Sequence, residues 1–387
     1  MGDTPDLDRT LEQLRQTGGL KWSLYPDAIG AFVAEMDFGT AEPVERALHD
    51  VVDRGLLGYL PPWLLEDLSR AWAGFAQQRF GWTVPPARVR PLADVVSGLV
   101  VAMEHFSKPG RPVILPTPAY MPFLVVPSEL GRDIIQVPMT LEEGRYVYDL
   151  DALETAYAAG GDLLVLCNPH NPIGRVLEPD EMHAISRVVD RHGGRVFSDE
   201  IHAPLVYDGH THVPYASLSG TTAAHTVTAV SASKAWNLPG LKCAQLVLSN
   251  DADAALWEEV GTFPEHGASN PGVVANIAAY TEGGPWLDAL LTQLDASRKL
   301  LGDLLSTYLP EIGYRAPEGT YLAWLDCREL GLGDHPGEFF AAEAGVALTD
   351  GPACGDVGAG FVRYNFATPR AVMERTVEQM AGAVRRR

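Results

Sequence analysis

Lys234 and its neighbours form the part of the sequence whose residue types are best suited to chemistry. Lys234 lies in the run SASKAWNLPGLKC, which also contains Ser231, Ser233 and a second cation, Lys242. A lysine amine becomes a nucleophile towards carbonyl groups when burial or a nearby cation disfavours its charged form. Hydroxyl groups and a second cation would bind a phosphate. The run therefore suits a ligand that carries an aldehyde and a phosphate, and the alternative is a Ser/Gly-rich loop with two exposed lysines.

Two more polar residues come directly after short apolar runs that predict buried strands. Asn168 follows DLLVLC and Asp199 follows RVFS, while Lys234 comes soon after a third run, TVTAV. In a parallel α/β sheet, ligand sites form outside the carboxyl ends of the strands. We therefore expect Asn168, Asp199 and Lys234 to converge at one edge of a sheet.

These residues belong to a larger pattern that resembles a known family, the pyridoxal-phosphate enzymes of aminotransferase fold type I. Within it, the chain resembles the MalY/PatB-like cystathionine beta-lyases, which are carbon–sulfur lyases, from about residue 21 to about residue 380. The resemblance implies an α/β fold, with a mostly parallel seven-stranded sheet between helices in a large domain and a smaller α+β domain. Seven motifs carry it, in the family's order: VAEMDF at 33–38, GY at 58–59, NPHNP at 168–172, SDEIH at 198–202, the run at 231–243, GTYLAWLD at 319–326 and RYNFA at 363–367.

The resemblance assigns the central chemistry to four residues. Lys234 would bind the cofactor's aldehyde and, once freed by substrate, act as general base at the substrate Cα. Asp199 would keep the pyridine nitrogen protonated, so that the ring accepts the electron pair left at Cα. Asn168 would hydrogen-bond the cofactor's phenolic oxygen near the substrate carboxylate, and Tyr120 would stack on the ring. A helix cap, a plain turn and a core tyrosine are the alternatives for Asp199, Asn168 and Tyr120.

The remaining expected contacts concern the phosphate and the substrate. Arg363 resembles the arginine that binds the substrate α-carboxylate through two parallel hydrogen bonds, with Ala34 beside it. An ordinary surface arginine is the alternative. Tyr59 matches a tyrosine that reaches the phosphate in the neighbouring subunit, so we expect a homodimer. The other expected cofactor contacts are Ser97, Gly98, Leu99, His202, Ser231, Ser233 and Lys242.

The resemblance favours elimination from an S-substituted L-cysteine, such as L-cystathionine, because a thiolate is a good leaving group. The products would be a thiol, pyruvate and ammonia. Decarboxylation or oxidative deamination of a cysteine conjugate, and transamination, remain alternatives, as does a regulator that binds pyridoxal phosphate without a catalytic role. Glu35, Leu60, Ser97 and Cys354 depart from the family's usual residues, which favours a broad or specialised cysteine conjugate.

Length and charge agree with this hypothesis. The 387 residues suffice for two cores, and we expect an N-terminal arm with part of the small domain (1–45), a large cofactor-binding domain (46–284) and a C-terminal small domain (285–387). A net charge of −21 argues against nucleic acid and anionic membranes as partners. Without a signal peptide or a long apolar run, the cytoplasm is the expected location. The four cysteines and 11 histidines show no metal-ligand spacing, so we expect no metal.

Overall fold

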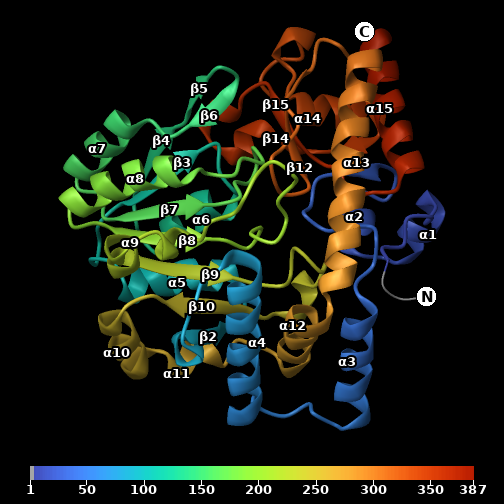
Figure 1. Ribbon diagram of the computed structural model, residues 1–387. Coiled ribbons are helices and arrows are strands. Elements are labelled where there is room, and N and C mark those ends of the chain that lie inside the picture. Colours follow the sequence, from blue (N-terminus) through green and yellow to red (C-terminus); the bar gives the residue numbers. More distant parts are fainter. Residues whose placement is uncertain (1–3) are drawn as a thin grey trace.

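A seven-stranded sheet forms the centre of the larger part of the molecule in the computed structural model, which describes residues 4–387 (Figure 1). The strand order is β2-β10-β9-β8-β7-β3-β4. β10 is antiparallel to both its neighbours, and the pairs among β9, β8, β7, β3 and β4 are parallel. The strands are β2 (Val89–Leu92), β10 (Ala244–Leu248), β9 (Thr226–Val230), β8 (Arg195–Asp199), β7 (Leu163–Cys167), β3 (Val113–Thr117) and β4 (Ile134–Pro138).

The central strands are apolar at almost every position because helices cover both faces of the sheet. Along β7, Leu163 and Val165 pack into one hydrophobic cluster and Leu164 and Leu166 into another. This alternation follows from the two-residue period of a strand. The first cluster includes residues of α5 (Val95–His105), α6 (Pro122–Glu129) and α10 (Asp251–Val260), and the second includes residues of α7 (Leu150–Ala158) and α8 (Pro179–Arg191).

A second, antiparallel sheet lies in the C-terminal part of the chain. Its strand order is β11-β12-β15-β14, and the long helix α13 runs alongside it and down to α12 (Figure 1). α13 and α15 pack on one another through a shared hydrophobic cluster that also holds Leu322 and Val362 of the sheet. The elements are α12 (Asn270–Glu282), α13 (Gly284–Tyr308), β11 (Gly313–Tyr314), β12 (Leu322–Asp326), α14 (Pro336–Phe339), β14 (Thr349–Asp350), β15 (Phe361–Asn365) and α15 (Arg370–Arg385).

The N-terminal segment joins the C-terminal part of the fold through a short parallel pairing. β1 (Ile29–Gly30) pairs with β13 (Val346–Ala347), and the chain then crosses towards the large sheet before α3 begins. Among residues 4–387, no helix has both the length and the apolar character needed to cross a membrane. The other elements are α1 (Leu11–Gln16), α2 (Leu20–Ser23), α3 (Glu42–Asp53), α4 (Pro62–Phe80), β5 (Thr140–Glu142), β6 (Arg145–Val147), α9 (Gly220–His225) and α11 (Thr262–Glu265).

The predicted fold class is confirmed. The three apolar runs that precede the predicted site residues form β7, β8 and β9, and these strands are neighbours in the sheet. The division at residues 45 and 284 stays a proposal, and α13 begins at the second of these positions.

Candidate active site

Two of the three residues predicted to converge, Asp199 and Lys234, line one cavity at an edge of the large sheet. Asp199 is the last residue of β8, and it pairs in register with the last residue of β7. Lys234 follows β9 by four positions. A cavity of about 170 Å³ opens at this edge, and Asp199, Lys234, Tyr120 and His202 line it. The ends of β8 and β9 therefore meet at this cavity, and the side chain of Asn168, after β7, does not line it.

The amine of Lys234 lies inside this cavity and makes one hydrogen bond. Its Nζ donates to the backbone carbonyl of Ala34 at 3.0 Å. Burial, together with the positive charge of Arg363, lowers the pKa of Lys234 to about 8. A substantial fraction of the amine is therefore neutral near physiological pH, which is the form that attacks a carbonyl or removes a proton.

Asp199 lies at the floor of the cavity as a buried carboxylate. Its Oδ1 accepts a hydrogen bond from the backbone N–H of Ile201 at 3.0 Å, and the thiol of Cys167 lies 3.7 Å from Oδ2. Burial raises the pKa of Asp199 to about 6. His202 is also buried, and burial holds its pKa well below the usual value, so this ring is neutral. A cation next to Asp199 would be stabilised by the carboxylate.

Asn168 does not have the position expected of it, and Asn171 does. The Asn168 side chain is fully buried, accepts a hydrogen bond from the backbone N–H of Leu177 at 2.9 Å, and lies 3.8 Å from the Met182 sulfur. Asn171 lines the cavity, and its Oδ1 accepts a hydrogen bond from Arg363 at 3.1 Å. The prediction for Asn168 was therefore wrong, because its amide fixes the loop after β7 instead of facing the cavity.

Arg363 lies on β15 and contacts Asn171, which lines the cavity. Its guanidinium is 1% exposed, and Nη2 donates to the Phe32 carbonyl at 2.5 Å. Its Nε has no hydrogen-bond partner within the described part of the chain. Arg363 does not itself line the cavity, but its hydrogen bond to Asn171, which does, places the guanidinium next to it. The small sheet thus supplies the cationic end of the site.

The N-terminus of α5 also opens on the cavity. Residues 93–96 line the cavity, as do Lys242 and Ser233. Asp94 caps the helix by accepting from the Ser97 N–H at 2.8 Å, and Lys242 pairs with Asp94 at 3.0 Å. A helix N-terminus with a lysine beside it suits a phosphate.

Four of the residues expected to contact the phosphate or the ring do not line the cavity. Ser97 binds Asp94 with both its N–H and its hydroxyl, and Gly98 packs against Phe197 and Ala229. Because α5 begins at Val95, its free N-terminal N–H groups come before Ser97. We therefore now propose the phosphate site at the turn that precedes the helix. The other two are Leu99, which is fully buried in the core, and Ser231, whose hydroxyl binds the Cys243 carbonyl.

Comparison with known proteins agrees with this geometry. The family model of aminotransferase class I and II matches residues 33–380. The chain belongs to this family. A cystathionine beta-lyase of Corynebacterium glutamicum is 37% identical over 97% of this chain and 99% of the relative. Cystathionine beta-lyase PatB of Bacillus subtilis is 34% identical over 92% and 93% of the two chains.

Solved structures of the aminotransferase class I and II fold superpose closely on this chain. The PLP-bound C-S lyase of Staphylococcus hominis superposes with a TM-score of 0.89 at 26% identity, and 99% of each chain is covered. The family and fold predicted from the motifs are therefore confirmed.

The residues of the cavity fit pyridoxal phosphate, the cofactor of this family. An amine for an aldehyde, a carboxylate for a ring nitrogen and a helix N-terminus for a phosphate line one cavity. Tyr120 is mostly buried in its wall and packs edge-on against Phe123. His202 also lines this cavity, beside Asp199.

Several residues of the site were not predicted from the sequence. Asn171 stands in the quoted NPHNP motif, but nothing in the motif distinguishes its direction from that of Asn168. Asp94 lines the cavity and is the N-cap of α5, and the N-cap pattern of an Asp three residues before Ser97 could have identified it. Tyr321 and Asn365 lie in motifs that carried the resemblance, and their contacts with the N-terminal segment depend on tertiary structure.

Proposed function

We propose that this chain is a pyridoxal-phosphate-dependent carbon–sulfur β-lyase acting on S-substituted L-cysteines, with L-cystathionine as one substrate. The reaction consumes water and yields a thiol, pyruvate and ammonia. The observation that carries the proposal is the Lys234 amine, of lowered pKa, in one cavity with the buried Asp199 carboxylate. The names of the C. glutamicum and B. subtilis relatives support the choice of elimination.

The cavity residues have separate parts in this reaction. When bound, pyridoxal phosphate supplies a ring that accepts electrons from the substrate Cα. Asp199 holds the ring nitrogen in its protonated form, because a buried carboxylate pairs with a cation there. Lys234 binds the aldehyde carbon and, when released, takes the proton from Cα. Lys242, Ser233 and the first turn of α5 hold the phosphate.

Arg363 and Asn171 orient the substrate from the other side. Arg363 remains charged at any physiological pH, and we assign the substrate α-carboxylate to its guanidinium. The Oδ1 of Asn171 accepts a hydrogen bond from the guanidinium at 3.1 Å and so fixes its position. The substrate would then be held at two points, its α-carboxylate by Arg363 and its α-amino group by the cofactor. Holding both would direct the Cα proton towards Lys234 and so speed its removal by proximity.

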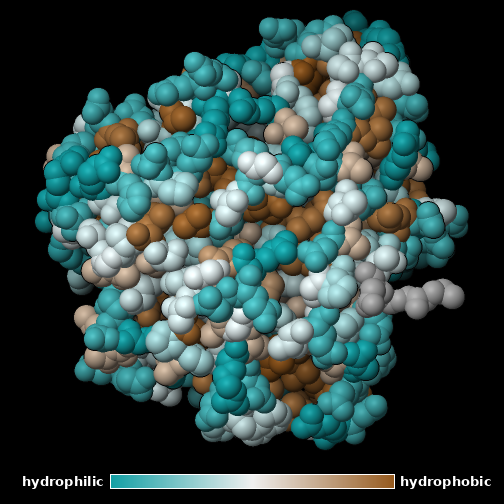
Figure 2. All heavy atoms as spheres, viewed as in Figure 1, coloured by the Kyte–Doolittle hydropathy of each residue, from teal (hydrophilic) through white to brown (hydrophobic). Residues whose placement is uncertain are grey.

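We also propose that the active form is a homodimer. Tyr59, on the loop between α3 and α4, is 97% exposed and lies outside the cavity of its own chain. It lines a groove of about 1160 Å³ with Leu57, Leu65 and Pro271. Figure 2 also shows hydrophobic side chains exposed between α3 and α4. A second copy covering this face would remove apolar surface from water and bring Tyr59 to the neighbouring phosphate site.

The test is a spectrum followed by a product assay. Purified protein with pyridoxal phosphate should show a visible absorption band that Lys234→Ala lacks, and L-cystathionine should give equal amounts of thiol and pyruvate. A keto acid that retains the sulfur would assign transamination, and a product that has lost the carboxylate would assign decarboxylation. Wild-type protein without the band would contradict the proposed function.

A further inference from the structure

Residues 32–36, here called the strap, pass along the cavity at Ala34, and side chains bind every backbone carbonyl in it. The Phe32 carbonyl accepts from Arg363 and from Thr349, and the Ala34 carbonyl accepts from Lys234. The strap has no regular secondary structure. The side chains that satisfy its backbone groups therefore decide where those groups point.

Asn365 binds the strap on both sides of Ala34. Its Nδ2 donates to the Val33 carbonyl at 2.7 Å and to the Glu35 carbonyl at 2.6 Å, and its Oδ1 accepts from the Ala367 N–H at 2.8 Å. Asn365 is 1% exposed, so each of these hydrogen bonds is made without competition from water. The carbonyl of Ala34 is left free to point elsewhere.

The large domain binds the strap at its other end. Asn237, three residues after Lys234, accepts from the Met36 N–H and donates to the Met36 carbonyl, each at 2.9 Å. The strap is therefore tied to Lys234's own loop by Asn237 and to Arg363's own strand by Asn365. It fixes the distance between the amine and the guanidinium.

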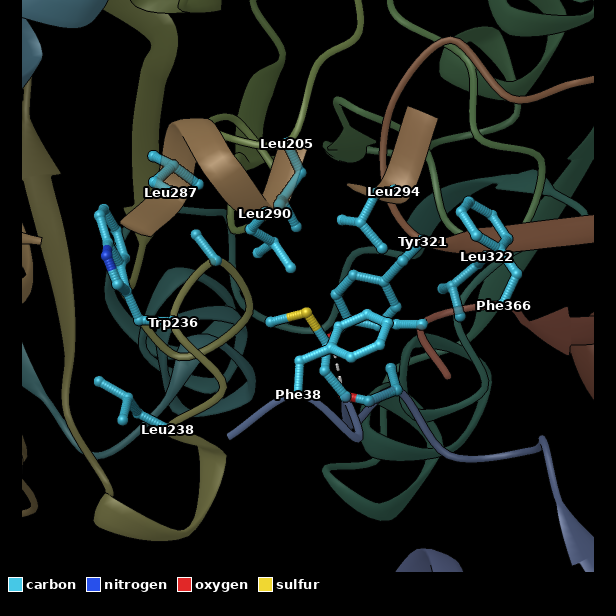
Figure 3. Close-up of a cluster of buried hydrophobic side chains, with 14 of the residues drawn as sticks. Phe38, Leu205, Trp236, Leu238, Leu287, Leu290, Leu294, Tyr321, Leu322 and Phe366 are labelled. Carbon is cyan, nitrogen blue, oxygen red and sulfur yellow. Dashed lines mark hydrogen bonds between the residues drawn. The ribbon is translucent and has the colours of Figure 1, made fainter. Parts of the chain in front are cut away.

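Tyr321 supplies the second donor to the Ala34 carbonyl. Its hydroxyl donates to Ala34 O at 2.9 Å, and the side chain is 1% exposed. The ring belongs to the hydrophobic cluster that contains Phe38, Leu294 and Phe366 (Figure 3). It also packs edge-on against the His202 ring, with centroids 5.9 Å apart. Packing thus fixes the ring, and the ring fixes the hydroxyl.

We propose that Tyr321 is a positioning residue, which holds the Ala34 carbonyl as the resting place of the Lys234 amine whenever that amine is not bound to the cofactor. This proposal rests on the proposed function. A carbonyl has two lone pairs, so Tyr321 and Lys234 bind it together. The amine is released when substrate takes its place, and it must then have a defined position from which it reaches Cα. Without one, a flexible lysine side chain would sample many rotamers.

The experiment removes only the hydroxyl, in Tyr321→Phe, and first uses cofactor-free protein. At about pH 10, above the Lys234 pKa of about 8, most of the amine is neutral in either protein. Changes in its pKa then have little effect on the rate. The visible absorption band monitors the covalent capture of pyridoxal phosphate. We expect this capture to be about fivefold to tenfold slower in Tyr321→Phe, which corresponds to the loss of one hydrogen bond.

A second readout separates proton removal from binding. The primary isotope effect on kcat with α-deuterated L-cystathionine should rise in Tyr321→Phe, because proton transfer becomes more rate-limiting. The KM and the dissociation constant of pyridoxal phosphate should each change by less than about twofold, because the bound amine no longer needs the Ala34 carbonyl.

Tyr314→Phe is the matched control. Its hydroxyl donates to the Arg298 carbonyl at 2.7 Å, remote from the strap, so both readouts should match those of wild type. Equal capture rates and isotope effects in Tyr321→Phe and wild type would overturn this proposal alone. A wild-type protein that captures no pyridoxal phosphate would overturn the proposed function, and this proposal with it.

Discussion

Asn171 and Asn168 stand three positions apart in one motif and should respond to substitution in different ways. Asn171→Ala removes the partner of the buried Arg363, so kcat/KM should fall about tenfold to a hundredfold, the range for a hydrogen bond to a charged group. Asn168→Ala leaves the Leu177 N–H unpaired, so it should lose about 1–3 kcal/mol of stability. Steady-state kinetics and thermal unfolding of both variants check this, and a large kinetic loss in Asn168→Ala with Asn171→Ala unaffected would contradict it.

Lys234 should make the stability of the cofactor-free protein depend on pH. Its pKa falls from 10.5 to about 8 on folding, so between these values the unfolded chain binds a proton that the folded chain does not. The free energy of unfolding therefore rises with pH across that window. Below about pH 8 the protein carries the full destabilisation caused by burying the charged amine.

Lys234→Met should consequently stabilise the cofactor-free protein at neutral pH. We expect a gain on the order of 2 kcal/mol, less than the pKa change implies, because the cavity exposes part of the side chain to water. The gain should fade as the pH approaches about 10. Urea unfolding over this pH range measures it, with the exposed Lys299→Met as control. A gain in stability that grows with pH would contradict the expected lowering of the Lys234 pKa on folding.

At the scale of the elements, strand ends were predictable and loop directions were not. The apolar runs before Asn168, Asp199 and Lys234 became β7, β8 and β9 because a strand buried on both faces needs such a run. The direction of Asn168 depends on the path of the loop that follows β7. That path is set by Leu177 and Met182, which come later in the chain. Sequence order alone does not specify it.

The start of α5 shows the same limit at a helix. The sequence led us to place the phosphate site at Ser97, yet the helix begins two residues earlier, after its cap at Asp94. A cap is recognisable only where the first helical turn has been located, and element boundaries are the least reliable part of a prediction. One helical turn is enough to move Gly98 and Leu99 from the cavity into the core.

The N-terminal helix α2 is joined to the segment after the strap by a buried ion pair. Lys21 Nζ lies 2.7 Å from Asp37 Oδ2, with side chains 2% and 3% exposed, and Trp22 donates to the other oxygen at 2.9 Å. Lys21→Met leaves the carboxylate buried without its cation and should cost about 3–5 kcal/mol of stability.

The control for this pair is an exposed one, Arg54 with Asp50. Arg54→Met should cost less than about 1 kcal/mol, because the pair lies in water. The double variant Lys21→Met/Asp37→Leu should recover part of the loss, since no charge is then left buried. Chemical denaturation of the four proteins measures these differences. Equal losses in Lys21→Met and Arg54→Met would refute the role given to the buried pair.

At the scale of the whole molecule, three parts of the chain form the cavity and its immediate surroundings. The large sheet provides Asp199 and Lys234, the small sheet provides Arg363, and the strap lies between them. An enzyme assembled this way depends on the relative position of its two sheets. In the proposed homodimer, Tyr59, which is exposed on a face that its own cavity does not reach, would supply a fourth part from a second copy.

Mixing two defective proteins tests this directly. Tyr59→Phe should bind pyridoxal phosphate more weakly, and Lys234→Ala should be inactive. If Tyr59 reaches the neighbouring subunit, a mixed dimer has one site with both defects and one intact site, whose Lys234 and Tyr59 come from different chains. Activity at limiting cofactor should therefore rise after the two proteins are unfolded together and refolded. If Tyr59 acts within its own chain, no mixed dimer contains an intact site and the mixture gains nothing. Sedimentation of the wild type supplies the dimer mass on which the experiment depends.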